Sequence, residues 1–200
     1  MIKKFVIKSC MKTIRNNYPE YDGTKLEKIQ YGLESLYLSV TKVIVIILLS
    51  ILLNTFIETL VIFLLFNIIR ATGFGLHASN SWICWITSIP TFGFGPFICK
   101  YLKLNFNILI ILSVISILCF IFFAPADTHK RPLIRKKRRI IYKILTVLIG
   151  IGYLLIILLI NNQFIKNAIV FSMILETILI CPLTYKLFKL PYSNYKKYNK

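Results

Sequence analysis

Residues 55–84 read TFIETLVIFLLFNIIRATGFGLHASNSWIC, and this stretch changes character at its midpoint. Its first half, residues 55–69, is a nearly unbroken apolar run that predicts a buried or membrane-spanning helix. Its second half, residues 70–84, is polar and rich in glycine, and it holds a histidine and a cysteine between two apolar blocks. We therefore take residues 70–84 as the candidate site and the apolar helices around it as its scaffold.

The spacing of His77 and Cys84 argues against a single straight helix. Seven residues of helix separate two side chains by about 10.5 Å along the axis, which is too far for proton transfer. Gly73, Gly75 and the polar run ending at Ser81 instead predict a loop around His77, followed by a helix with Ser81 as its N-cap. Cys84 would then lie in the first turn, where free N–H groups favour a thiolate, and His77 could fold back as its general base.

The plainer interpretation of both residues is structural. A lone cysteine in an apolar helix is ordinarily a small packing residue, and a lone histidine in a loop is ordinarily solvated. Together, at the start of a helix between apolar blocks, the two favour cysteine-protease chemistry, with the helix N–H groups as oxyanion donors. The other four cysteines form no CxxC pair and no metal-binding spacing, so we expect no disulfide framework, no metal and no cofactor. They are Cys10, Cys99, Cys119 and Cys181.

The composition predicts a polytopic membrane protein. Apolar residues make up 57% of the chain and charged residues 16%, and the mean hydropathy is +0.73. A net charge of +18 could suggest nucleic-acid binding. The basic residues, however, lie in short segments between apolar blocks, as the positive-inside rule requires. We therefore expect anionic membrane lipid, and no nucleic acid, as a partner.

The order of apolar and polar segments predicts an all-α, six-span protein with a single membrane domain over residues 1–200. Residues 1–23 form an amphipathic interfacial helix, and Thr24 with Glu27 is a capping box for the helix that follows. The outer half of the third span, from Pro90 on, should be kinked or broken, and residues 161–167 should be an outer loop. The Lys and Arg counts place both termini in the cytoplasm. The first span is expected to end near residue 53. The other five are expected to cover residues 55–69, 82–99, 104–123, 140–160 and 168–185.

Acidic residues beside apolar segments need partners, because an unpaired carboxylate there is costly. Three roles stay open for Glu34: an ion pair with Arg70, orientation of His77 as the third member of a triad, or contact with water at the interface. Glu58 is expected to be structural. In the basic cytoplasmic loop 124–139, the run 135–139 is a topology anchor or, less favoured, a substrate-binding segment.

Two motifs resemble the accessory gene regulator protein B family, which consists of integral-membrane cysteine endopeptidases that process quorum-sensing peptide precursors. The first matches at Arg70, Gly75, His77, Ala78, Ser81 and Cys84. The second, APADTHKRPL at 124–133, is similar to the APxDTxxxP loop of that family. One departure is Phe74, since many members have two adjacent glycines where this chain has Phe74 and Gly75.

From the residues and this resemblance we predict the site residues. Cys84 and His77 are catalytic; Glu34, Arg70, Gly75 and Ser81 support or orient them; and Asp127, Lys130, Arg131, Lys136 and Lys137 contact substrate or lipid. The resemblance implies cleavage of the acidic C-terminal tail of an AgrD-like precursor, which also carries an amphipathic leader. It further implies a thioester on the enzyme and closure of a thiolactone or lactone ring, giving an autoinducing peptide.

The resemblance also implies a homodimer in the bacterial cytoplasmic membrane, and the predicted topology puts the active site on its cytoplasmic side. The alternative is a small transporter or lipid-binding membrane protein in which the broken third span lines a pathway. That alternative predicts that the protein tolerates Cys84→Ser.

Overall fold

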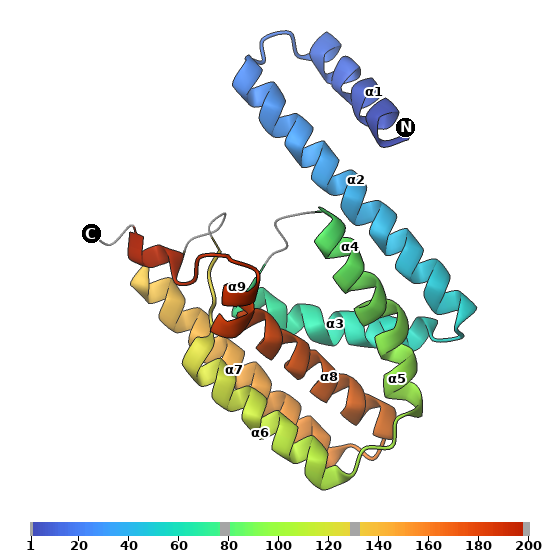
Figure 1. Cartoon of the computed structure of the whole chain (residues 1–200), viewed down its shortest axis with the longest axis vertical. Coiled ribbons are helices and arrows are strands. Elements are labelled where there is room, and N and C mark those ends of the chain that lie inside the picture. The colour runs from blue at the N-terminus through green and yellow to red at the C-terminus, as the bar shows by residue number, and fades with distance from the viewer. Residues whose placement is uncertain (1, 77–80, 129–132, 198–200) are drawn as a thin grey trace. The chain divides into compact units, whose positions relative to one another are not determined.

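The computed structural model describes residues 2–76, 81–128 and 133–197, and this part of the chain is built of helices (Figure 1). The all-α prediction is therefore confirmed. The chain forms two compact units, residues 1–49 and residues 50–200. In chain order the helices are α1 (Ile2–Asn17), α2 (Gly23–Leu52), α3 (Phe56–Gly73), α4 (Ser81–Ile89), the π-helical turn η1 (Pro90–Phe94), α5 (Gly95–Tyr101), α6 (Phe106–Phe123), α7 (Lys136–Leu159), α8 (Gln163–Ile180), α9 (Pro182–Leu187) and the 3-10 turn η2 (Asn194–Lys197).

Five of the described helices, α2, α3, α6, α7 and α8, are long and apolar enough to cross a membrane. This is consistent with a multi-pass membrane protein, but the count of six spans is not confirmed. The predicted third span consists of α4, η1 and α5, and the change of helix type begins at Pro90, which has no N–H to donate. Residues 81–101 stay helical throughout, so the expected kink or break takes the form of a π-helical turn within one helical run. The orientation of the termini stays a prediction.

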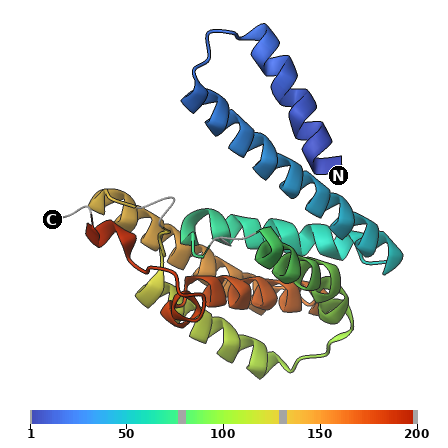
Figure 2. The same ribbon diagram turned by 45° about the horizontal axis from the view of Figure 1, so that its top comes forward.

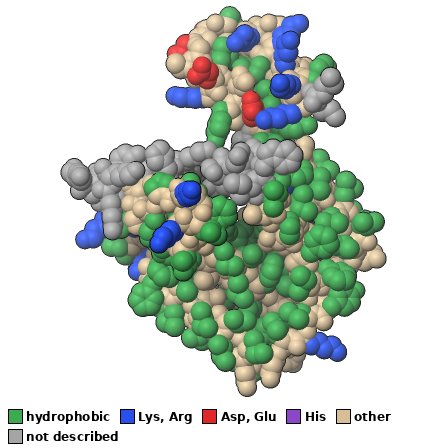
Figure 3. All heavy atoms as spheres, viewed as in Figure 1, with side chains coloured by type: hydrophobic (Ala, Val, Ile, Leu, Met, Phe, Trp, Pro, Cys, Tyr) green, Lys and Arg blue, Asp and Glu red, His purple; other side chains and the backbone are tan. Residues whose placement is uncertain are grey.

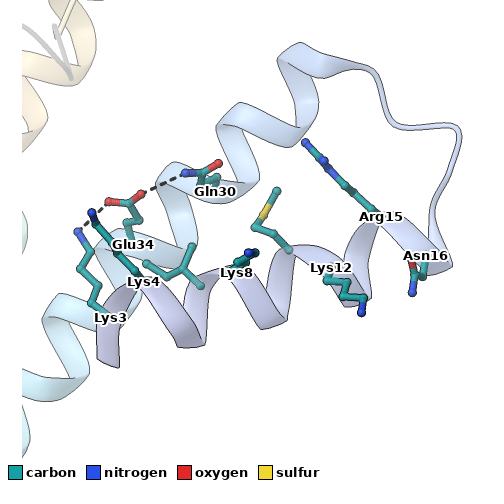
Figure 4. A pocket seen from close by; sticks show the side chains of 10 residues that line it. Lys3, Lys4, Lys8, Lys12, Arg15, Asn16, Gln30 and Glu34 are labelled. Carbon is teal, nitrogen blue, oxygen red and sulfur yellow. Dashed lines mark hydrogen bonds and ion pairs between the residues drawn. The ribbon is translucent and has the colours of Figure 1, made fainter. Parts of the chain in front are cut away.

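The N-terminal unit contains α1, which runs beside the first half of α2 as a helical hairpin (Figure 1). Ile7 and Met11 of α1 are buried in this hairpin. Figure 4 shows the Glu34 carboxylate between Lys3, whose Nζ lies 2.8 Å from Glu34 Oε2, and Gln30. The interfacial placement of α1 on a membrane stays a prediction.

The predicted capping box at the start of α2 is wrong. The helix begins at Gly23, and the carboxylate of Asp22 accepts a hydrogen bond of 2.8 Å from the backbone N–H of Lys25. The Thr24 hydroxyl donates to the same carboxylate oxygen at 3.0 Å. Asp22 is therefore the capping side chain, because its short carboxylate reaches the free N–H of Lys25, the third residue of the helix.

The larger unit is organised around α8, which packs against α3, α5, α6 and α7 (Figure 2). The hydroxyl of Tyr153 on α7 also donates to the carbonyl oxygen of Leu65 on α3 at 2.7 Å. Many apolar side chains of the spanning helices stay exposed, and Figure 3 shows them covering most of the visible face of this unit. Such a surface suits a lipid environment. The fully buried apolar core includes Ile69, Leu109, Phe120, Ile157, Ile169, Met173 and Ile180.

The structure agrees with one of two predicted connections and differs from the other in extent. A tight turn at Asn54 is confirmed, since this residue lies between α2 and α3 with φ 52°. The outer loop at 161–167 is wrong in extent: α8 begins at Gln163, where Asn162 caps it by accepting from the N–H of Ile165.

Asn167, expected in that loop, is instead buried in α8. Its side-chain amide donates to the carbonyl oxygens of Cys99 and Leu102, at 2.9 Å and 2.6 Å. These carbonyls belong to the C-terminal end of α5 and have no partner within their own helix. Asn167 is therefore drawn into the core by the acceptors that it satisfies.

Glu58 on α3 has the partner that its apolar surroundings require. Its carboxylate lies 2.8 Å from Nζ of Lys100 on α5, and the same ammonium group donates to the carbonyl oxygen of Asn54 at 3.0 Å. These contacts tie the end of α5 to the start of α3 and the turn before it, which agrees with the expected structural role of Glu58.

Candidate active site

The structure describes both flanks of the predicted catalytic interval. His77, Lys130 and Arg131 lie outside the described residues, and of Ser81 and Cys84 only the backbone is described. Helix α4 begins at Ser81 itself rather than at the residue after it, and Cys84 lies in the first turn, as predicted. The assignment of Cys84 as nucleophile and His77 as base stays a prediction. What the structure adds is how the chain leading to His77 is held.

Residues 73–76, which we call the loop base, are bonded to two other segments. The N–H of Gly75 donates to the carbonyl oxygen of Ala126 at 2.8 Å, and the N–H of Ala126 donates to the carbonyl oxygen of Gly73 at 3.1 Å. These bonds make a single parallel bridge between Phe74 and Ala126. The N–H of Leu76 donates to the carbonyl oxygen of Leu179, at the end of α8, at 2.8 Å. The loop base is thus fixed from two sides before the chain reaches His77.

Two glycines make this close approach possible. Gly75 has φ +77°, and a Cβ there would lie 2.6 Å from Nη1 of Arg70 and 2.7 Å from the carbonyl oxygen of Leu179. A Cβ at Gly73 would collide with the carboxylate of Glu176. The glycines therefore do more than provide flexibility, because each leaves space that a neighbouring polar group occupies.

Phe74 occupies a backbone conformation that favours glycine. Its φ of 61° and ψ of −100° lie in a region that residues with a side chain rarely adopt. Its ring packs edge-to-face on Tyr142 of α7, with centroids 5.0 Å apart. Such a contact stabilises by about 0.5–1.5 kcal/mol, which offsets part of the backbone strain. This is the position at which the chain departs from the paired glycines of the motif.

Arg70 links the loop base to a buried acid on α8. Its Nη2 donates to the carbonyl oxygens of Leu76 and Gly75 at 2.6 Å and 3.4 Å. Its Nη1 lies 3.5 Å from Oε2 of Glu176, whose side chain is completely buried. Arg70 therefore neutralises a buried carboxylate and holds the residue next to His77.

Glu176 is the functional candidate that the sequence analysis missed. We had considered Glu34 as the partner of Arg70, but Arg70 pairs with Glu176, and Glu34 pairs with Lys3. A signal was present, since Glu176 is the single acid in the apolar stretch 163–180. The predicted role of Glu34 in orienting His77 is left without a geometric test.

Asp127 anchors the second motif to the C-terminal tail. Its carboxylate is buried and accepts from the backbone N–H groups of Asn194 and Tyr195, both at 2.8 Å. The Tyr185 hydroxyl donates to the carbonyl oxygen of Asp127 at 3.1 Å. These bonds give Asp127 a structural role, and its predicted contact with substrate or lipid stays a prediction.

Lys136 and Lys137 are exposed in the first turn of α7, and their predicted contact with substrate or lipid is not tested by the structure.

The loop base and the two motifs lie within a region that is similar to a known family. A model of the family described as accessory gene regulator B matches residues 7–180. The chain belongs to the accessory gene regulator B family. The match spans the loop base, the 124–127 segment that bridges to it, and Glu176, so the geometry described above lies inside the region shared with the family.

Individual members of the family are similar over most of their length. An AgrB-like protein of Clostridium acetobutylicum is 33% identical over 92% of this chain and 88% of its own. An AgrB-like protein of Listeria innocua is 34% identical, with 86% and 84% covered. Accessory gene regulator protein B of Staphylococcus aureus is 31% identical, with 84% and 88% covered. No solved structure matches the chain.

Proposed function

We propose that this protein is an integral-membrane cysteine endopeptidase that removes the C-terminal tail of an AgrD-like precursor peptide for quorum sensing. Membership of the accessory gene regulator B family supports this proposal. The observation that carries it is the bonded loop base, because Arg70 and the backbone of α8 fix the residue just before His77. An exposed surface loop would not need to be held by these hydrogen bonds.

In the proposed reaction, His77 takes the thiol proton of Cys84, and the thiolate attacks the scissile carbonyl. Free N–H groups in the first turn of α4 donate hydrogen bonds to the oxyanion. His77 then gives the proton to the leaving amine, the C–N bond breaks, and a thioester to Cys84 remains. A thiol or hydroxyl of the peptide attacks this thioester, which closes a thiolactone or lactone ring and returns the Cys84 thiol.

The residue that precedes the proposed base is held by hydrogen bonds at both of its peptide groups. Leu76, the residue before His77, has its N–H bonded to Leu179 and its carbonyl oxygen bonded to Arg70. Both peptide groups that flank Leu76 are therefore held. Proton transfer requires donor and acceptor within hydrogen-bonding reach, and a small misplacement can cost on the order of 100-fold in rate.

Reconstitution in liposomes tests the proposal. The wild-type protein is mixed with the precursor peptide encoded beside it, and mass spectrometry follows the products. We expect a released C-terminal fragment and a core that is lighter by one water than its hydrolysed form. Cys84→Ser and His77→Ala should abolish both products, while Cys10→Ser, at an exposed cysteine of α1, should retain them.

Equal products from wild type and Cys84→Ser would remove Cys84 from the chemistry. That result would favour the transporter or lipid-binding alternative. The homodimer and the cytoplasmic active site belong to the same proposal, and cross-linking and accessibility labelling of the full-length protein test them separately.

A further inference from the structure

A cavity of about 440 Å³ opens where α6 ends and α7 begins, and residues 124–127 form part of its wall. One part of its wall is apolar and includes Phe122 and Ile140, which are 72% and 50% exposed. The other part is cationic and contains Arg139 and Lys143. The cavity therefore combines a surface suited to hydrocarbon with a surface suited to an anion.

The two cations lack an anion within the described part of the chain. Arg139 and Lys143 are one helical turn apart on α7, so they are neighbours on the same face and repel each other. No ion pair joins either of them to a described carboxylate. The guanidinium of Arg139 stacks 3.5 Å above the Tyr195 ring, and its Nη1 is buried without an acceptor. A buried donor left unsatisfied is costly, and a bound oxyanion would satisfy it.

Two other polar groups of the cavity already have hydrogen-bond partners within the protein. Asp127 lines it, but its carboxylate oxygens are occupied by the backbone N–H groups of Asn194 and Tyr195. Burial raises the pKa of Tyr192, so this hydroxyl stays neutral and donates to the carbonyl oxygen of Phe123 at 3.4 Å. The cationic groups are thus available to an external ligand.

We propose that this cavity binds the phosphate of an anionic phospholipid, with Arg139 and Lys143 as its ligands and an acyl chain along Phe122 and Ile140. Basic pockets between membrane helices suit such headgroups. A free phosphate would use the cations alone, whereas a phospholipid also covers the exposed apolar wall. The amphiphilic lining therefore favours the lipid.

The site has a direct connection to the loop base. Ala124, Pro125, Ala126 and Asp127 line the cavity, and Ala126 is the residue that bridges to Phe74. A lipid in the cavity packs against this segment and stabilises the arrangement that holds the chain before His77. This effect of the lipid on the loop base rests on the proposed function, but lipid binding itself does not.

Native mass spectrometry of the delipidated full-length protein measures the binding without reference to catalysis. The protein is titrated with phosphatidylglycerol, phosphatidylcholine and inorganic phosphate. We expect one preferred phosphatidylglycerol per chain, and the double variant Arg139→Gln/Lys143→Gln should weaken this binding about tenfold or more. The matched control Lys186→Gln/Lys189→Gln removes the same charge from exposed residues outside the cavity and should bind as the wild type does.

Several results would overturn the proposal. Equal binding of phosphatidylglycerol by wild type and the cavity variant would place the lipid elsewhere, and an equal loss in the control would show an effect of net charge. Equal binding of phosphatidylcholine would show that the cavity does not require an anionic lipid. Inorganic phosphate or an acidic peptide that binds more tightly than the lipid, and depends on Arg139 and Lys143, would assign the cavity to that ligand.

A second variant keeps the test independent of folding. Arg139→Lys/Lys143→Arg retains both charges and should preserve lipid binding, and Lys143→Gln alone should weaken it if the double variant does not fold. Circular dichroism of each variant checks helix content. If precursor cleavage fails while lipid binding follows this pattern, the lipid site stands and the proposed peptidase function does not.

Discussion

Two ion pairs in this molecule show that a short distance is a poor guide to importance. Lys3 and Glu34 in the N-terminal hairpin are 2.8 Å apart, and their side chains are 39% and 37% exposed. Arg70 and Glu176 are 3.5 Å apart, but Glu176 is fully buried and Arg70 also holds two carbonyl oxygens of the loop base. An exposed pair contributes about 0–1 kcal/mol, whereas breaking a buried one leaves an uncompensated charge.

The charged residues around the two ion pairs also differ in how far they are exposed to water. The groove between α1 and α2 has a volume of about 620 Å³ and is lined by Lys3, Lys4, Lys8, Lys12 and Arg15 (Figure 4). These cations are exposed or only partly buried, so water screens them. The loop base has fewer charged residues, and burial and hydrogen bonds to the backbone hold them in place. The comparison teaches that constraint, rather than charge density, distinguishes the candidate catalytic region.

The largest effect should come from breaking the buried pair. Arg70→Leu leaves the Glu176 carboxylate without its cation, and we expect a loss of about 3–5 kcal/mol in the free energy of unfolding. Denaturation followed by circular dichroism in detergent measures this loss. The double variant Arg70→Leu/Glu176→Leu should recover most of the stability but none of the precursor cleavage, because the loop base still lacks its guanidinium. Recovery of cleavage would show that Arg70 serves stability alone.

Gly75→Ala should have the next largest effect. The new Cβ meets Arg70 and Leu179 and is held at a positive φ, so we expect destabilisation of about 1–3 kcal/mol together with lower cleavage. Gly152→Ala on α7 is the matched control, because no atom lies within 4 Å of its added Cβ. This control should be neutral or stabilise by up to about 1 kcal/mol. Similar unfolding midpoints for the two variants would contradict the packing described here.

A smaller effect is expected at Phe74. Phe74→Gly relieves the backbone strain but removes the packing on Tyr142, so the net change in the free energy of unfolding should stay within about 1 kcal/mol. Phe74→Ala keeps the strain and loses the ring, and it should be the less stable variant. The opposite order in thermal unfolding would show that the backbone at Phe74 is not strained.

The smallest effect should be at the exposed pair. Lys3→Ala should cost less than about 1 kcal/mol, and the cost should shrink in high salt because water and ions screen the interaction. The cost of Arg70→Leu should depend much less on salt, since Glu176 is buried. Unfolding of both variants at low and high salt tests this contrast, and an equal salt dependence would remove it.

Much of the fold could be predicted because it depends on local signals. Apolar runs predicted the helices, Asn54 marked a turn, and Pro90 marked a change of helix type. The partner of Arg70 could not be predicted, because Glu176 lies 106 positions away and only packing brings the two together. The same holds for Asp127 and the tail residues that it binds. The sequence identified the elements of the candidate site, and tertiary structure decided how they are held.

The bonds at the loop base also bear on how related sequences can diverge. The N–H groups of Gly75 and Leu76 donate to the carbonyl oxygens of Ala126 and Leu179, and every residue type carries such an oxygen. Replacement of residue 126 or 179 by another that fits the space keeps the bond, whereas replacement of Arg70 or Gly75 removes a guanidinium or fills a gap. Distant homologues can therefore differ at the two acceptor positions, within the space available, and still share this architecture, so Arg70, Gly75 and Glu176 are the informative positions for detecting them.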